Sequence, residues 1–201
     1  MQPDERSRYA VFRGLFGRGV YPFQAAFLLL NPLRRLILSP AQLAERLGLV
    51  RTSRVLELGT GPGYFSPTIA RCVAAGLWVG FDLQRPMLQM ARRRVARHTN
   101  AHGGVVQGDG LRLPFAPGSF DVVFLVAVLG EVPDPAMCLR GCRRLLVPGG
   151  RLSITEQPGD PDALSPEELR ALTAREAFAF ESVHGRGKSF TLNFRRLDSA
   201  T

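Results

Sequence analysis

Lysine is nearly absent from this 201-residue sequence: Lys188 is its one lysine, and the other 25 basic residues are arginines. Acidic residues number only 17, so the formal net charge is +9. A surplus of that size favours contact with phosphates, an anionic lipid surface or an acidic substrate. The alternative explanation is the codon bias of a GC-rich genome, in which arginine replaces lysine. In either case the net charge bears on binding partners and not on the fold.

Cysteine is scarce as well. Cys72, Cys138 and Cys142 form no even disulfide framework, which favours a reducing, cytoplasmic location. Cys138 and Cys142 are four residues apart on one predicted helix face, but two soft ligands without a further Cys/His pair do not make a zinc site. No metal site is therefore expected.

A long uninterrupted apolar run is missing too. The most apolar early stretch, residues 23–38, is broken by Asn31, Pro32, Arg34 and Arg35, and falls short of the ~20 residues that span a bilayer. No secretory signal is visible either. The stretch could still lie on a membrane surface or cover a pocket.

The chain does contain a regular alternation of predicted strands and helices. A helix opens at Ser39-Pro40, with Leu43, Leu47 and Val50 on its apolar face and Gly48 as its stop. Beyond it, the predicted strands are 55–58, 77–81, 105–106, 120–126 and 151–155, and the predicted helices are 64–75, 86–97 and 135–146. Strands separated by helices indicate a parallel sheet of βαβ units.

The C-terminal part has a different pattern. Residues 177–183 and 189–195 read as two strands joined by a turn over residues 184–188, which predicts an antiparallel hairpin. The expected fold class is therefore α/β, Rossmann-like, with helices on both faces of a mostly parallel sheet. We expect one domain over residues 1–201, with 1–38 as an N-terminal arm or lid and 39–201 as the core.

The strongest local signal is a glycine-rich turn between the first predicted strand and the next helix. Gly59, Gly61 and Gly63 allow a sharp turn and close backbone approach to a ligand. The third glycine comes one residue earlier than a dinucleotide fingerprint requires. Taken alone, the motif is also compatible with an ordinary tight βα turn.

Two acidic residues strengthen a nucleotide-site interpretation. Asp82 ends the second predicted strand, where a carboxylate can accept both ribose hydroxyls of an adenosine. Asp109 follows the third strand and could accept from an adenine amine, although an Asp in a loop is often a turn residue. Since the carboxyl ends of parallel strands meet at one edge, these groups point to one crevice.

Together these motifs resemble the class I S-adenosylmethionine-dependent methyltransferases, and most closely the branch of ubiquinone and menaquinone methylases. The resemblance covers residues 40–156 and rests on 57–63, Asp82, 108–111, 113–115, 119–123 and 147–150. It implies a seven-stranded sheet whose last strand is antiparallel, and S-adenosyl-L-methionine as cofactor.

The resemblance also implies roles for individual residues. Around the methionine moiety it places Glu57, Gly59, Thr60, Gly61 and Gly63. It assigns Asp82 to the ribose, Leu83 and Met87 to the adenosine, and Asp109, Gly110 and Leu111 to the adenine. Val126, where the family usually has a small polar residue, would offer its backbone to the amino-acid end of the cofactor.

Methyl transfer is an in-line displacement, so a general base is needed only when the acceptor must lose a proton. Glu131 is the candidate, and it could act as a base, attract a cationic acceptor or merely cap the next helix. His98, His102 and His184 are predicted to lie outside the site.

The acceptor has to be inferred from the N-terminal arm and the charge. Nothing after residue 126 resembles the Asn/Asp-Pro-Pro-aromatic turn of amino-group nucleic-acid methylases, and no nucleophilic Cys lies there. The preferred function is methyl transfer to a small apolar or amphipathic acceptor. An RNA methyltransferase and a non-catalytic basic adapter are the alternatives. The arginine- and aromatic-rich arm could meet a membrane surface or an anionic substrate.

Overall fold

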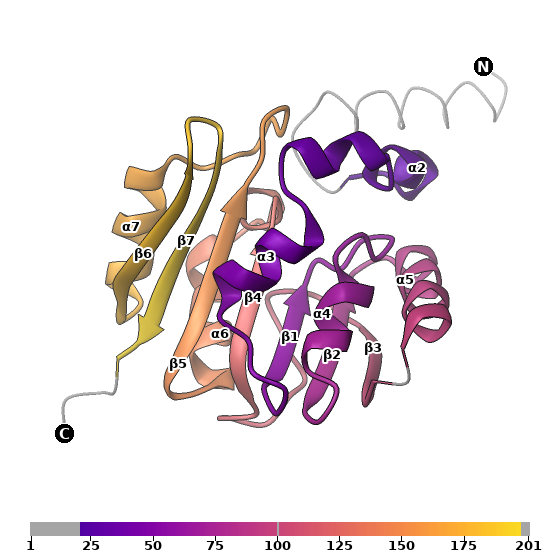
Figure 1. Cartoon of the computed structure of the whole chain (residues 1–201). Coiled ribbons are helices and arrows are strands. Elements are labelled where there is room, and N and C mark those ends of the chain that lie inside the picture. Colours follow the sequence, from indigo (N-terminus) through magenta and orange to yellow (C-terminus); the bar gives the residue numbers. More distant parts are fainter. Residues whose placement is uncertain (1–20, 100, 198–201) are drawn as a thin grey trace, which may run out of the picture.

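A single seven-stranded sheet forms the centre of the computed structural model, which describes residues 21–99 and 101–197 (Figure 1). Its order is β3-β2-β1-β4-β5-β7-β6, with β1 to β5 parallel and β7 antiparallel to both neighbours. This arrangement confirms the predicted fold class. The strands are β1 (Arg54–Leu58), β2 (Leu77–Asp82), β3 (Gly103–Gln107), β4 (Phe120–Val126), β5 (Leu146–Glu156), β6 (Phe178–Arg186) and β7 (Ser189–Arg196).

Helices cover both faces of the sheet. The helical elements are η1 (Phe23–Ala25), α2 (Ala26–Leu29), η2 (Pro32–Leu36), α3 (Pro40–Leu47), α4 (Ser66–Cys72), α5 (Arg85–His98), η3 (Leu129–Glu131), α6 (Pro135–Leu145) and α7 (Pro166–Arg175). One apolar cluster joins α3, α4 and α5 to the sheet, and a second joins α6 and α7 to its other side. In the described part of the chain, no helix has the length and apolar character needed to cross a membrane.

The central strands are buried on both sides, as their continuous apolar sequences predict. Successive side chains of β1 illustrate the alternation: Val55 packs in the α3–α5 cluster and Leu56 in the α6–α7 cluster. Both are fully buried. The strand period of two therefore divides one short apolar run between two cores.

Helix α3 begins and ends where its sequence predicts. The Ser39 hydroxyl accepts the Gln42 N–H and the Gln42 side chain accepts the Ser39 N–H, forming a capping box. Gly48 ends the helix in the left-handed conformation, with φ 61°. Assigning Val50 to the apolar face was wrong, because it lies beyond this stop and is 61% exposed.

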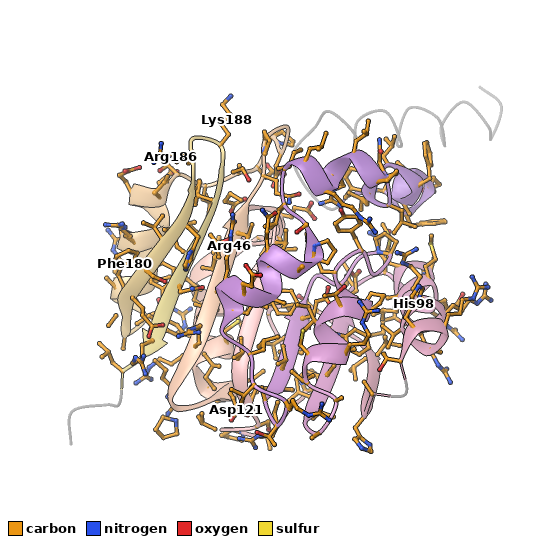
Figure 2. The ribbon with its side chains drawn as sticks, in the orientation of Figure 1. Arg46, His98, Asp121, Phe180, Arg186 and Lys188 are labelled. Carbon is orange, nitrogen blue, oxygen red and sulfur yellow. The ribbon has the colours of Figure 1, made fainter. Side chains whose placement is uncertain are left out.

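Three other local predictions need correction. The sequence Pro148-Gly149-Gly150, which by composition predicts a turn before a strand at 151–155, is instead part of β5, where the register against β4 shifts between Phe120 and Val122. Helix α4 begins at Ser66 rather than at Tyr64, because the glycine turn continues through Gly63. The β6–β7 connection is only Gly187-Lys188, and Figure 2 shows Lys188 at its tip.

The sheet order reverses between β1 and β4, since β2 and β3 lie to one side and β5 to the other. Open α/β sheets bind ligands beyond the carboxyl ends of the strands at such a switch point. Residues 21–38 pass over this end of the sheet (Figure 1), and Asp121 lies at the opposite end (Figure 2). The switch point is therefore the place to look for a site.

Candidate active site

A cavity of about 340 Å³ lies at this switch point. It is lined by the glycine turn after β1, by the ends of β2 and β4, and by the loops after β3 and β5. Tyr21, Leu28, Leu29 and Arg34 line it from above. The volume is in the range of small-molecule and cofactor sites.

The three glycines of the turn serve different purposes. All have positive φ: 75° at Gly59, 53° at Gly61 and 80° at Gly63. A Cβ at Gly61 would meet only Leu29 Cδ1, at 3.9 Å, so this glycine exposes its backbone to the cavity. A Cβ at Gly63 would lie 2.7 Å from Ala91 Cα, so Gly63 permits close packing of α5 and does not line the cavity.

Asp82 holds the glycine turn as well as facing the cavity. Its Oδ2 accepts the Gly61 N–H at 2.8 Å, and its Oδ1 accepts the Gln84 N–H at 2.8 Å. Burial raises the pKa of Asp82, and backbone hydrogen bonds from Gln84, Gly61 and Leu83 oppose that rise. The carboxylate thus links the turn after β1 to the start of α5.

Glu57 lies beneath the turn and is 3% exposed. Its Oε2 accepts the Trp78 Nε1–H at 2.9 Å. Burial raises the pKa of Glu57 to about 7, against the hydrogen bond from Trp78 that lowers it. The buried carboxylate can serve a cationic group in the cavity above, since Glu57 is among the lining residues.

The remaining residues at the cofactor end come from the turns after β1, β2 and β3, from the first turn of α5 and from the end of β4. Thr60, Leu83, Met87, Asp109, Gly110 and Val126 all line the cavity. Asp109 is exposed and its Oδ1 accepts the Leu111 N–H at 2.9 Å, so it also forms a turn. Leu111 does not line this cavity but a separate surface hollow beside α6.

Glu131 lies at the other end of the cavity, on η3 after β4. Burial, followed by the nearby Asp160, Asp162 and Asp82, raises the pKa of Glu131 to about 8, and a hydrogen bond from the Tyr21 N–H opposes this. Asp160 and Asp162 reach the cavity from the loop after β5. Sequence reasoning identified Glu131 but missed these two aspartates, because their loop carries no motif.

Residues 21–38 form a roof that hydrogen bonds tie to both ends of the cavity. The Tyr21 carbonyl accepts from Gln84 Nε2 at 2.7 Å, and the Tyr21 N–H donates to Glu131 at 3.4 Å. Residues 1–20 of the predicted arm lie outside the described residues. The described part therefore bridges the start of α5 and the turn after β4.

Arg34 is the principal residue of this roof that sequence reasoning passed over. Its guanidinium donates to Leu29 O and to Gln157 Oε1, both at 2.6 Å. It also lies 5.0 Å from the centre of the Tyr64 ring, a cation–π arrangement. Burial lowers the pKa of Arg34, and the nearby Tyr64 and Tyr21 oppose that shift.

The turn leaving β4 carries backbone strain. Ala127 has φ 54°, an unusual value for a residue with a side chain, and its N–H donates to Thr155 O at 2.8 Å. Val126 and Val128 on either side line the cavity. Strain of this kind is characteristic of functional sites, where surrounding packing maintains it.

Comparison with known proteins identifies this combination of fold and glycine turn. Residues 56–154 match a family described as "Methyltransferase domain". A SAM-dependent methyltransferase from Aquifex aeolicus superposes with a TM-score of 0.82 at 20% identity, covering 89% of this chain and all of that one. Residues 56–154 of the chain are therefore a methyltransferase domain, and the fold is that of a SAM-dependent methyltransferase.

Sequence relatives of this chain are methyltransferases that are named for different acceptors. Demethylmenaquinone methyltransferase of Tropheryma whipplei is 38% identical over 112 residues, which cover 56% of this chain and 45% of the relative. Malonyl-[acyl-carrier protein] O-methyltransferase of Legionella pneumophila is 30% identical over 146 residues, or 72% and 48% of the two chains. The chain spans about half the length of these curated relatives.

Proposed function

We propose that this protein transfers a methyl group from S-adenosyl-L-methionine to a small amphipathic acceptor. The observation that carries the proposal is one continuous cavity that joins the glycine turn and Asp82 to a second end beneath residues 21–38. The first end suits the cofactor and the second leaves room for an acceptor. When bound, the cofactor would supply an activated methyl group on a sulfonium.

The cofactor end has the chemistry this ligand needs. We assign the ribose to Asp82 and the adenine to Asp109 and Gly110, with Leu83 and Met87 against the adenosine. Gly59, Thr60 and Gly61 offer backbone for the methionine moiety, as does Val126, and Glu57 supplies a buried negative charge for its ammonium. Gly63 and Leu111 would shape the turns from behind rather than touch the ligand.

The chain's contribution to the reaction would be alignment and exclusion of water. Orienting two reactants can supply about 7–11 kcal/mol of the barrier, without any covalent role for the protein. Residues 21–38 would act as the lid part of the N-terminal arm, held over the cavity by the hydrogen bonds of Tyr21 and Arg34. Glu131, whose pKa is raised to about 8, would be a stronger base than an ordinary carboxylate and could accept a proton from the acceptor in its ionised form, which predominates above that pH.

An RNA methyltransferase or a basic adapter is less well supported. The surplus of arginine lies outside a cavity whose lining is acidic, so the basic charge does not describe the site. Contact of the arm with a membrane or an anionic group remains part of the proposal, since Phe27, Leu33 and Leu36 are exposed there. Three free cysteines are compatible with a cytoplasmic location.

Calorimetric titration with S-adenosylhomocysteine tests the proposal. The full chain should bind it, and Asp82→Ala should weaken binding by about 1.5–3 kcal/mol, the value of hydrogen bonds to a charged group. Glu167→Ala, which removes an exposed carboxylate from α7, is the matched control and should change nothing. No binding by the unmodified chain, or equal binding by Asp82→Ala, would refute the cofactor assignment.

A further inference from the structure

The charge of the cavity is opposite to that of the whole chain. Among the described residues, six acidic side chains line it and Arg34 is its one basic residue; the acids are Glu57, Asp82, Asp109, Glu131, Asp160 and Asp162. The chain as a whole has a net charge of +9. The acidic lining is therefore a local property of the site.

Cofactor binding does not account for all six acids. Glu57, Asp82 and Asp109 belong to β1, β2 and the loop after β3, the half of the sheet assigned to the cofactor. The other three follow β4 and β5, on the far side of the switch point. The acceptor end thus has its own acidic groups.

Backbone packing holds these acidic groups together. A Cβ at Gly130 would lie 1.8 Å from Asp162 O, so the turn after β4 and the loop after β5 are in direct backbone contact. Glu156, 1% exposed, lies at the end of β5, and burial together with Asp160 and Glu131 raises its pKa to about 8. Burial and the carboxylates of their neighbours raise the pKa values of Glu131 and Glu156 together, so Glu131, Glu156 and Asp160 lie close enough to repel one another when ionised.

A second observation, independent of the acids, indicates a polar ligand at this end. Gln157 lines the cavity and is only 7% exposed. Its Oε1 accepts from Arg34, but its buried Nε2 has no hydrogen-bond partner. A buried donor without a partner costs about 1–3 kcal/mol, which an acceptor atom on a bound ligand would recover.

We propose that the acceptor of this methyltransferase is an amphipathic amine, which binds with its ammonium facing Glu131 and Asp160 and with a neighbouring oxygen accepting from Gln157 Nε2. The ammonium would lose a proton to the ionised Glu131 carboxylate, and the nitrogen lone pair would then form the new N–C bond as the bond between the methyl group and the sulfonium breaks and S-adenosylhomocysteine leaves. The apolar part of the molecule would lie against Leu28 and Val132, which line the same end. A cation relieves the repulsion among the carboxylates, whereas a carboxylate-bearing acceptor increases it. That the amine is methylated rests on the proposed methyltransferase function. That an amine binds here rests only on the residues of the acceptor end.

Three probes that differ in one group distinguish the acceptor classes. They are 2-amino-1-phenylethanol, 1-phenylethane-1,2-diol and mandelate, which present an ammonium, a hydroxyl and a carboxylate on the same frame. Calorimetric titration of the full chain, with and without saturating S-adenosylhomocysteine, measures each affinity. We expect the amine to bind at least about ten-fold more tightly than the diol, with mandelate weakest.

Substitutions at the acceptor end test which side chains cause the preference for the amine over the diol. Glu131→Gln should reduce the preference for amine over diol to about three-fold or less, and Glu167→Gln, an exposed carboxylate on α7, should preserve it. Gln157→Met should weaken the amine and the diol alike, because both share the hydroxyl. Thermal melting checks folding, and Asp160→Asn replaces Glu131→Gln if that variant is unstable.

The two proposals fail separately. A diol or mandelate that binds as tightly as the amine, or no amine binding at all, overturns the amine inference while S-adenosylhomocysteine binding stands. Loss of S-adenosylhomocysteine binding with the amine preference intact overturns the methyltransferase proposal instead. An amine preference that survives in both Glu131→Gln and Asp160→Asn would also overturn the inference, because the charge would then lie elsewhere.

Discussion

Replacing Gly59 by alanine isolates what the first glycine of the turn contributes. The new Cβ would lie 2.2 Å from Val128 Cγ2 and 2.8 Å from Cγ1, so the side chain after β4 or the turn itself has to move. The φ of 75° adds a cost of about 1–3 kcal/mol for a residue with a side chain. Overpacking adds about 1–3 kcal/mol more, so the free energy of unfolding should fall by roughly 2–6 kcal/mol.

Gly149→Ala is the matched control for this substitution. Gly149 has a similar φ of 69°, but a Cβ there would meet nothing within 4 Å. The control therefore measures the backbone strain alone, and urea denaturation of both variants gives the packing cost by difference. Gly59→Ala should also abolish measurable S-adenosylhomocysteine binding, whereas Gly149→Ala should leave it unchanged.

Val128→Ala in the Gly59→Ala background tests the cause directly. It removes both Cγ atoms and leaves Val128 Cβ at 3.1 Å, a distance the structure can absorb with a small shift. The double variant should recover stability relative to Gly59→Ala, a favourable coupling in a double-mutant cycle. The reasoning is refuted if Gly59→Ala is no less stable than Gly149→Ala, or if removing the Val128 methyl groups restores nothing.

Three further results are expected. Gly61→Ala should lose S-adenosylhomocysteine affinity because its Cβ enters the cavity, and its stability should fall only by the strain of a positive φ, as in Gly149→Ala. Gly63→Ala should lower the melting temperature further, because its Cβ would lie 2.7 Å from Ala91 Cα of α5; a Gly63→Ala variant as stable as Gly61→Ala would contradict the roles given to the two glycines. Because burial raises the pKa of Glu131 in the folded state, its stabilising effect is complete below about pH 4.5 and is lost as pH rises through about 8. Glu131→Gln should therefore flatten the fall in melting temperature of the ligand-free protein over that range, and an unchanged pH profile would count against the burial. Arg34→Met should keep the packing of the stem but release the roof, seen as faster proteolysis within residues 21–38; unchanged cleavage would show that the other contacts suffice.

The cofactor half of the site could be predicted because its residues lie in local patterns. Gly59, Gly61 and Gly63 occur between a buried strand and a helix, and Asp82 ends the next strand, so chain order alone indicates that they share an edge. The strand alternation and the C-terminal hairpin predicted the sheet for the same reason. The prediction failed at Pro148-Gly149-Gly150, where β5 pairs with β4 on both sides of an irregularity, at Leu146 and again from Arg151, and so runs through residues whose composition favours a turn.

The acceptor half depended on the tertiary structure. Arg34 meets Gln157 across 123 positions of sequence, and Gly130 brings the loop of Asp160 and Asp162 against the turn of Glu131. No spacing in the chain indicates such contacts, because they depend on how two loops and a roof pack over the sheet. The sequence by itself determined the fold class and predicted the cofactor end, whose groups are set by position along consecutive strands. The tertiary structure decided that the acceptor end is acidic as well, since Glu131, Asp160 and Asp162 come together only after the loops following β4 and β5 meet.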